Sequence, residues 1–95
     1  MIFRLPEGAE NREIVRFREE FYGREKPSGG GKYSFHHEGL LERIPHRRLI
    51  RGVVILRERD LEEVERFLRG WRARIETRVI RATPKDERAL DRSST

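Results

Sequence analysis

The sequence predicts a small α+β domain whose elements follow the order β-α-β-β-α-β. Two segments carry apolar residues at helical spacing, and shorter segments around them are rich in β-branched residues or alternate apolar with polar ones. The 95 residues suffice for one domain with a modest core. Because only 35% of the residues are hydrophobic and 41% are charged, a few well-patterned elements must supply that core.

The first half of the chain is predicted to hold two strands and one helix. Ile2–Leu5 is a short apolar strand, and Asn11 caps a helix that ends at Gly23. Arg24–Gly31 contains a proline, a serine and three glycines, which predicts a mobile loop. Alternation in Tyr33–His37 predicts a strand. The next residues, 39–45, fit either an extension of that strand or a helical turn, and a proline ends either one.

The second half is predicted to supply two more strands and two helices. Within Arg48–Arg57, four consecutive β-branched or leucine residues predict a central strand buried on both faces. Asp60 and Glu63 have the spacing of a capping box at the start of a second helix. Ala73–Ala82 alternates like a strand, and Thr83 with the proline after it opens a short last helix.

These elements together predict a ferredoxin-like split β-α-β-β-α-β fold. Its four-stranded antiparallel sheet carries two helices on one face, and the short C-terminal helix is added to it. We expect residues 1–92 to form this single domain and residues 93–95 to form a frayed tail. The other face of the sheet would be open to water, a ligand or a partner chain.

The charge predicts a polyanionic partner, with solubility alone as the alternative. The net charge is +5 and the pI about 10.4. Only three of the 22 basic residues are lysines, and the arginine guanidinium suits phosphate well. A GC-rich genome would also enrich arginine. The lack of cysteine and of any long apolar run predicts a cytoplasmic protein without membrane contact, and the abundant arginine and glutamate also fit a thermophile.

Two segments are the predicted nucleic-acid contacts. The first is a glycine-rich stretch whose bare N–H groups and lysine would meet phosphate and whose aromatic rings would stack on bases. The second is an arginine-rich turn, since positions 43–57 hold no acidic residue. The alternatives are a flexible linker and a solvated turn. The candidate residues are Gly29, Gly30, Gly31, Lys32, Tyr33, Phe35, Arg43, Arg47, Arg48 and Arg51.

Three histidines are the candidates for catalysis. His36, His37 and His46 can exchange protons near neutral pH, which a metal-independent ribonuclease or another phosphate-ester enzyme would need. His36 and His37 point to opposite faces of a strand and therefore cannot share one site. The simpler interpretation is that all three are exposed polar residues. No metal site and no cofactor are predicted, because the histidines lack recognisable ligand spacing.

The element order resembles that of RNA-recognition domains. Residues 2–5 stand where the first-strand motif of that class would lie, and Arg51-Gly52 matches the start of its third-strand motif. Val53 and Ile55 replace the two stacking aromatics of that motif. Stacking on bases would therefore depend on Phe3, Tyr33 or Phe35. A homodimer through the open face would equally explain the apolar pair. The sequence therefore predicts nucleic-acid binding with RNA preferred, and a nuclease or a protein-docking module as alternatives.

Overall fold

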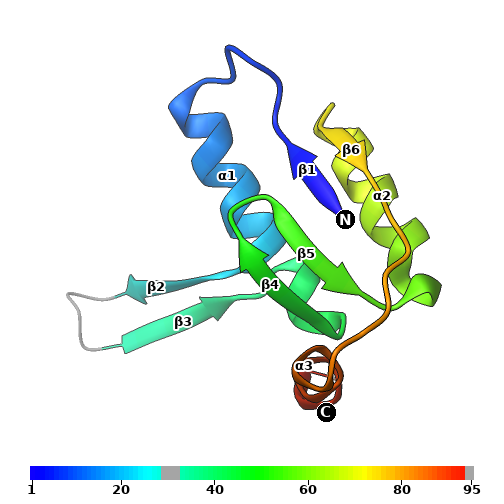
Figure 1. Ribbon diagram of the computed structural model, residues 1–95. Helices are drawn as coiled ribbons and strands as arrows, with labels where there is room; N and C mark the ends of the chain where they lie inside the picture. The colour runs from blue at the N-terminus through cyan, green and yellow to red at the C-terminus, as the bar shows by residue number, and fades with distance from the viewer. Residues whose placement is uncertain (29–32, 94–95) are drawn as a thin grey trace.

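The chain folds as an α+β unit in which a four-stranded antiparallel sheet is accompanied by three α-helices (Figure 1). We use a computed structural model, which describes residues 1–28 and 33–93. The predicted class is confirmed. In chain order, the elements are β1 (Ile2–Arg4), α1 (Asn11–Tyr22), β2 (Arg24–Ser28), β3 (Tyr33–His37), the 3₁₀ turn η1 (Leu40–Arg43), β4 (His46–Ile50), β5 (Val53–Leu56), the 3₁₀ turn η2 (Glu58–Asp60), α2 (Leu61–Gly70), β6 (Arg74–Glu76) and α3 (Pro84–Ser93).

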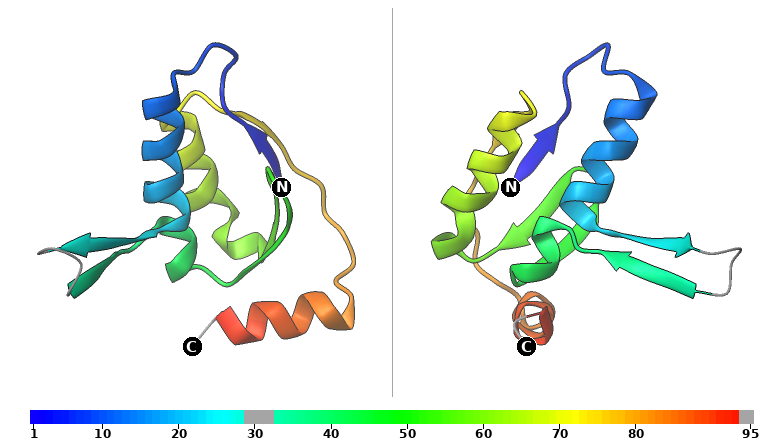
Figure 2. Two further views of the ribbon diagram at one scale, coloured as in Figure 1. Left: turned by 90° about the vertical axis from the view of Figure 1, so that its left-hand side faces the viewer. Right: turned by 180° about the vertical axis from the view of Figure 1, so that it is seen from behind.

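The main sheet has the strand order β4-β5-β1-β6, with every neighbouring pair antiparallel. Helices α1 and α2 lie on one face of it (Figure 2). This arrangement is compatible with the predicted ferredoxin-like one. Residues 77–83 connect β6 to α3 outside any strand or helix, so the predicted strand Ala73–Ala82 shrinks to three residues.

The prediction of a loop at Arg24–Gly31 is wrong in its first part. Arg24–Ser28 is strand β2 and pairs with β3 from Arg24↔His37 to Ser28↔Tyr33. A proline in this segment suggested a loop, yet a two-stranded ribbon tolerates proline where the missing N–H would face away from the partner strand. We call β2 and β3 the arm, since they project away from the main sheet (Figure 1). The sequence predicted that β3 would be a strand of the main sheet, and this prediction is wrong, because β3 pairs only with β2.

Strand β4 takes the edge position in the main sheet that was predicted for Tyr33–His37. The segment Arg48–Arg57, predicted to be one strand, contains the second half of β4, a turn and β5. The turn between β4 and β5 contains Gly52, whose φ of 83° is the left-handed conformation that glycine favours. Its carbonyl accepts a hydrogen bond from the N–H of Phe3 at 2.9 Å, and this anchors the turn to β1. In β5 only Val54 is buried, so the prediction of a strand buried on both faces is also wrong.

The helix ends show which local signals act. Gly23, with φ 91°, ends α1 as predicted, but Asn11 is the first helical residue and not its cap. Asp60 makes no capping hydrogen bond, because η2 leads into α2 and places Asp60 in helical geometry. Thr83 caps α3 as predicted, since its Oγ1 accepts the N–H of Asp86 at 3.2 Å.

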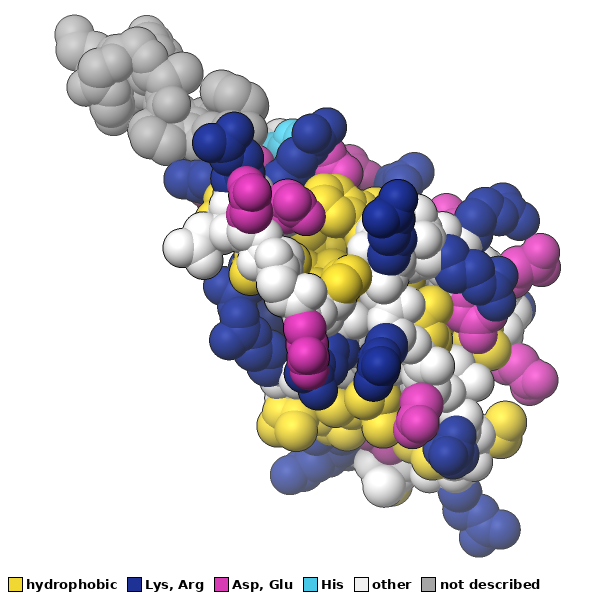
Figure 3. Space-filling view, turned by 90° about the horizontal axis from the view of Figure 1, so that it is seen from above, with side chains coloured by type: hydrophobic (Ala, Val, Ile, Leu, Met, Phe, Trp, Pro, Cys, Tyr) yellow, Lys and Arg dark blue, Asp and Glu magenta, His cyan; other side chains and the backbone are white. Residues whose placement is uncertain are grey.

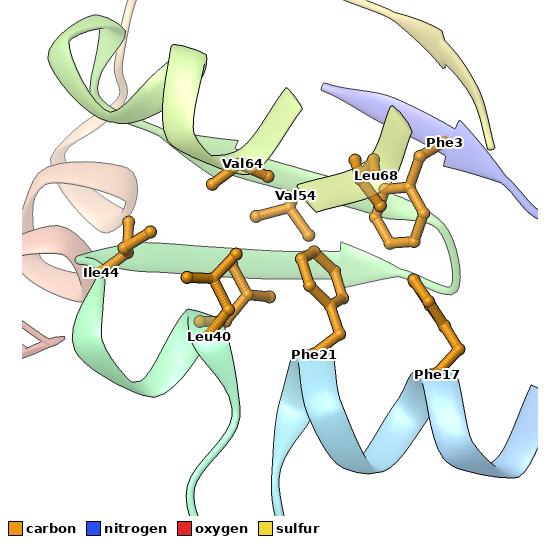
Figure 4. Packing of buried hydrophobic residues seen from close by; sticks show 9 residues of the cluster. Phe3, Phe17, Phe21, Leu40, Ile44, Val54, Val64 and Leu68 are labelled. Carbon is orange, nitrogen blue, oxygen red and sulfur yellow. The ribbon is translucent and has the colours of Figure 1, made fainter. Parts of the chain in front are cut away.

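The core lies between the two helices and the sheet, and it is rich in phenylalanine (Figure 4). Phe21 is fully buried, with ring centroids 5.1 Å from Phe3, 5.2 Å from Phe17 and 5.4 Å from Phe67. Offset and edge-on aromatic contacts of this kind add to the energy of burying the rings. The buried cluster is Phe3, Phe17, Phe21, Leu40, Leu41, Ile44, Val54, Val64 and Leu68.

Candidate nucleic-acid interface

Two of the four predicted phosphate-binding arginines contact acidic groups within the protein. Arg47 Nη1 lies 2.5 Å from Asp86 Oδ1 and ties β4 to α3. Asp86 is buried, and the backbone N–H of Thr83 together with Arg47 lowers the pKa of Asp86. Arg43 Nε lies 3.3 Å from Glu38 Oε1 on the surface. Arg47 therefore has a structural role, because its positive charge balances the buried carboxylate of Asp86.

The other two arginines, Arg48 and Arg51, lie beside helix α1. The guanidinium carbon of Arg48 is 3.8 Å from the centroid of the Tyr22 ring, which is a cation–π contact. Arg48 is paired with the buried Val54 in the β4–β5 register, so both side chains point to the helix side of the sheet. Arg51 stands in the turn that follows β4.

Helix α1 adds a third arginine to this pair. Arg18 precedes Tyr22 by four residues and therefore shares its helix face. Burial raises the pKa of Tyr22, while the charges of Arg48, Arg18 and Arg51 act on the same pKa in the opposite direction. We call Arg18, Arg48 and Arg51 the arginine cluster. Among the described residues, none of the three has a carboxylate within 4.0 Å.

A groove of about 550 Å³ adjoins the arginine cluster. It runs between β1, the connection to α1, α1 itself and the β4–β5 turn, and both Arg18 and Arg51 line it. Its apolar lining includes the half-buried side chains of Leu5 and Ile14. Figure 3 looks down on the end of the molecule that holds the β1–α1 connection, and it shows hydrophobic side chains exposed between basic ones. The site thus combines positive charge with a surface that gains from losing water.

The histidines are placed at the base of the arm and at the start of β4. The two ring nitrogens of His36 contact Glu25, at 2.7 Å, and Glu42. These contacts, with Glu42 first, raise the pKa of His36. His46 Nδ1 donates to the carbonyl of Ile44 at 2.8 Å, and His37 lies half-buried on β3. His36 therefore serves as a link between the arm and η1, while the catalytic role of the three histidines stays a prediction.

The glycine-rich segment is largely beyond what the structure shows. Gly29, Gly30, Gly31 and Lys32 lie outside the described residues, and Tyr33 and Phe35 are placed on β3 by their backbone pairing with β2. Phe3, the third candidate for stacking, is 7% exposed and packs into the core on the helix side of the sheet. Stacking by Phe3 on the open face is therefore ruled out.

The sequence named Arg48 and Arg51 as candidates but gave no reason to name Arg18 and Tyr22. Positive and negative side chains are interleaved along α1, which predicted an ordinary solvated helix face. The β4–β5 hairpin then brings two further arginines, Arg48 and Arg51, close to this helix. A weak signal was present, because Arg18 and Tyr22 stand four residues apart with no acidic residue four positions from Arg18.

No protein-family model, curated protein or solved structure matches this chain. Within residues 1–28 and 33–93, no helix has the length and apolar character needed to cross a bilayer. The same residues contain no group of three or more histidine or acidic side chains arranged to hold a metal ion.

Proposed function

We propose that this protein binds nucleic acid, with RNA preferred, on a ferredoxin-like scaffold, and that the arginine cluster holds the phosphates. The observation that carries the proposal is that Arg18 and Arg51 line one groove and Arg48 contacts Tyr22 on the adjoining face of α1. Among the described residues, none of the three has a carboxylate within 4.0 Å. Like charges held together are unfavourable unless an anion joins them. A phosphate backbone supplies several such anions in a row.

Three arginines elsewhere differ from the arginine cluster, because each of them has a carboxylate partner. Arg66 and Arg69 on α2 lie 3.3 Å and 2.9 Å from glutamates four residues before them, and Arg47 is tied to Asp86. Those guanidiniums already have anionic partners. The glycine-rich contact predicted from the sequence would offer a second place for the same nucleic-acid strand.

Binding of a labelled single-stranded RNA 12-mer, followed by fluorescence anisotropy, tests the proposal. We expect Arg51→Ala to weaken binding by about 3- to 10-fold, since it removes one charge-assisted phosphate contact. Arg66→Ala is the matched control, because it changes the net charge equally but removes an arginine with a glutamate partner. Absence of binding, or equal losses in both variants, would contradict the proposal. Cleavage of the RNA in EDTA that is lost in His46→Ala would instead support the nuclease alternative.

A second candidate is self-association through the open sheet face. Ile2, Val53 and Ile50 share that face in the β-sheet register, and Ile2 and Ile50 are 48% and 73% exposed. Neighbouring exposed apolar side chains favour a protein contact. Light scattering after size exclusion should then give a dimer that Ile50→Lys converts to a monomer, whereas a wild-type monomer would exclude this candidate.

A further inference from the structure

We propose that the groove beside the arginine cluster receives one unstacked base of a single-stranded nucleic acid, while Arg18 and Arg51 hold phosphates next to that base. This inference rests on the proposed function and specifies its ligand. It predicts a preference for single strands over duplexes, because bases in a duplex are paired and stacked and cannot enter a groove.

The size and lining of the groove support a base as the occupant. Its volume of about 550 Å³ lies within the range of about 300–1,000 Å³ that small-molecule sites occupy. Leu5, just after β1, and Ile14 on α1 supply apolar surface. The flat faces of a base are apolar enough to displace water from such a surface, while its edges can face the solvent.

The charge at the groove identifies which apolar ligand fits. Arg18 and Arg51 both line the groove, and neither has a carboxylate within 4.0 Å among the described residues. The carboxylate that lines the groove at Glu7 is engaged by Arg4 at 3.1 Å. The groove thus favours a ligand that joins an apolar ring to neighbouring negative charge, which is what one nucleotide of a single strand presents.

Two pentamers separate base recognition from phosphate binding. The first has an abasic sugar at all five positions, and the second carries one adenine at the centre of the same backbone. If the groove holds a base, the wild-type protein should bind the second pentamer about 5-fold more tightly or better, which is the low end of the effect of stacking one base on an aromatic ring. Equal affinities for both, with binding still weakened by salt, would overturn this inference while leaving the proposed function intact.

Two variants on neighbouring positions of α1 locate the effect. Ile14 lines the groove, whereas Val15, 48% exposed, does not. Ile14→Trp should fill the groove and abolish the advantage of the adenine pentamer without changing the affinity for the abasic one. Val15→Trp should leave both affinities unchanged. If dodecyl phosphate displaced the abasic pentamer as well as the adenine pentamer did, the groove would be a site for alkyl chains and the inference would fail.

Discussion

Replacing Gly39 with alanine tests how the arm is joined to the body of the protein. Gly39 precedes η1 with φ −93° and ψ 161°, a conformation that any residue adopts, so only the available space decides the outcome. A Cβ atom there would lie 2.2 Å from the backbone nitrogen of Gly23 and 2.5 Å from the carbonyl carbon of Tyr22. These are backbone atoms at the end of α1, and no side-chain rotation can relieve the contact.

The size of the effect follows from that overlap. Real Cβ atoms essentially never come closer than 3.0 Å to a non-neighbouring heavy atom. The end of α1, which includes Tyr22, must therefore move by about 0.8 Å. Overpacking usually costs 1–3 kcal/mol, and we expect the upper end, about 3 kcal/mol. A chain of this length has a stability of about 5–14 kcal/mol. The midpoint of thermal unfolding should therefore fall by about 12–24 °C.

Urea unfolding, followed by far-UV circular dichroism and by the fluorescence of Trp71, measures this change. Trp71 packs against Phe17, with ring centroids 5.5 Å apart, and so reports on the core. Gly70→Ala is the control, because a Cβ atom at that position at the end of α2 meets nothing within 4 Å. It should be neutral or stabilising by up to about 1 kcal/mol. A Gly39→Ala protein within 1 kcal/mol of the wild type would refute the packing described.

Three further results are expected. The pKa of His36 is raised by its two glutamates, so the folded state binds that proton more tightly. The stability that it contributes should be complete below about pH 6.5 and should decline as the pH rises through the folded pKa, and His36→Gln should remove this dependence in melts between pH 5.5 and 8.5. The pKa of Asp86 is lowered, so its contribution should be present at pH 7 and lost on acidification, while Asp86→Asn should lower the melting temperature at pH 7 only. Phe21→Ala should cost about 3–5 kcal/mol in urea unfolding, and a smaller loss would contradict the aromatic core.

Local patterns predicted the elements whose signals act locally. The spacing of Phe17 and Phe21 placed α1, Gly23 marked its end, and Thr83 marked the start of α3. The pairing of Arg24–Ser28 with β3 was not predictable from composition. Whether such a segment forms a strand depends on the neighbouring strand it pairs with more than on its own residue types.

The site shows the same limit. The lack of acidic residues at positions 43–57 singled out a basic region, but it could not show which of its arginines would contact acidic groups elsewhere in the chain. Arg47 meets an aspartate 39 residues away, and Arg48 meets a tyrosine on α1. Only the hairpin turn at Gly52 brings Arg51 to the same groove as Arg18. Charge that is free for a ligand is thus a property of the fold, not of the local sequence.

The dependence of RNA affinity on salt tests the central claim most directly. For single strands, each phosphate contact contributes about 0.7 to the slope of log K against log of the salt concentration. We predict that the double variant Arg18→Ala/Arg51→Ala lowers that slope by about 1.4, while Arg66→Ala/Arg69→Ala, with the same net charge, leaves it unchanged. Equal slopes for the two double variants would show that the arginine cluster does not hold phosphates.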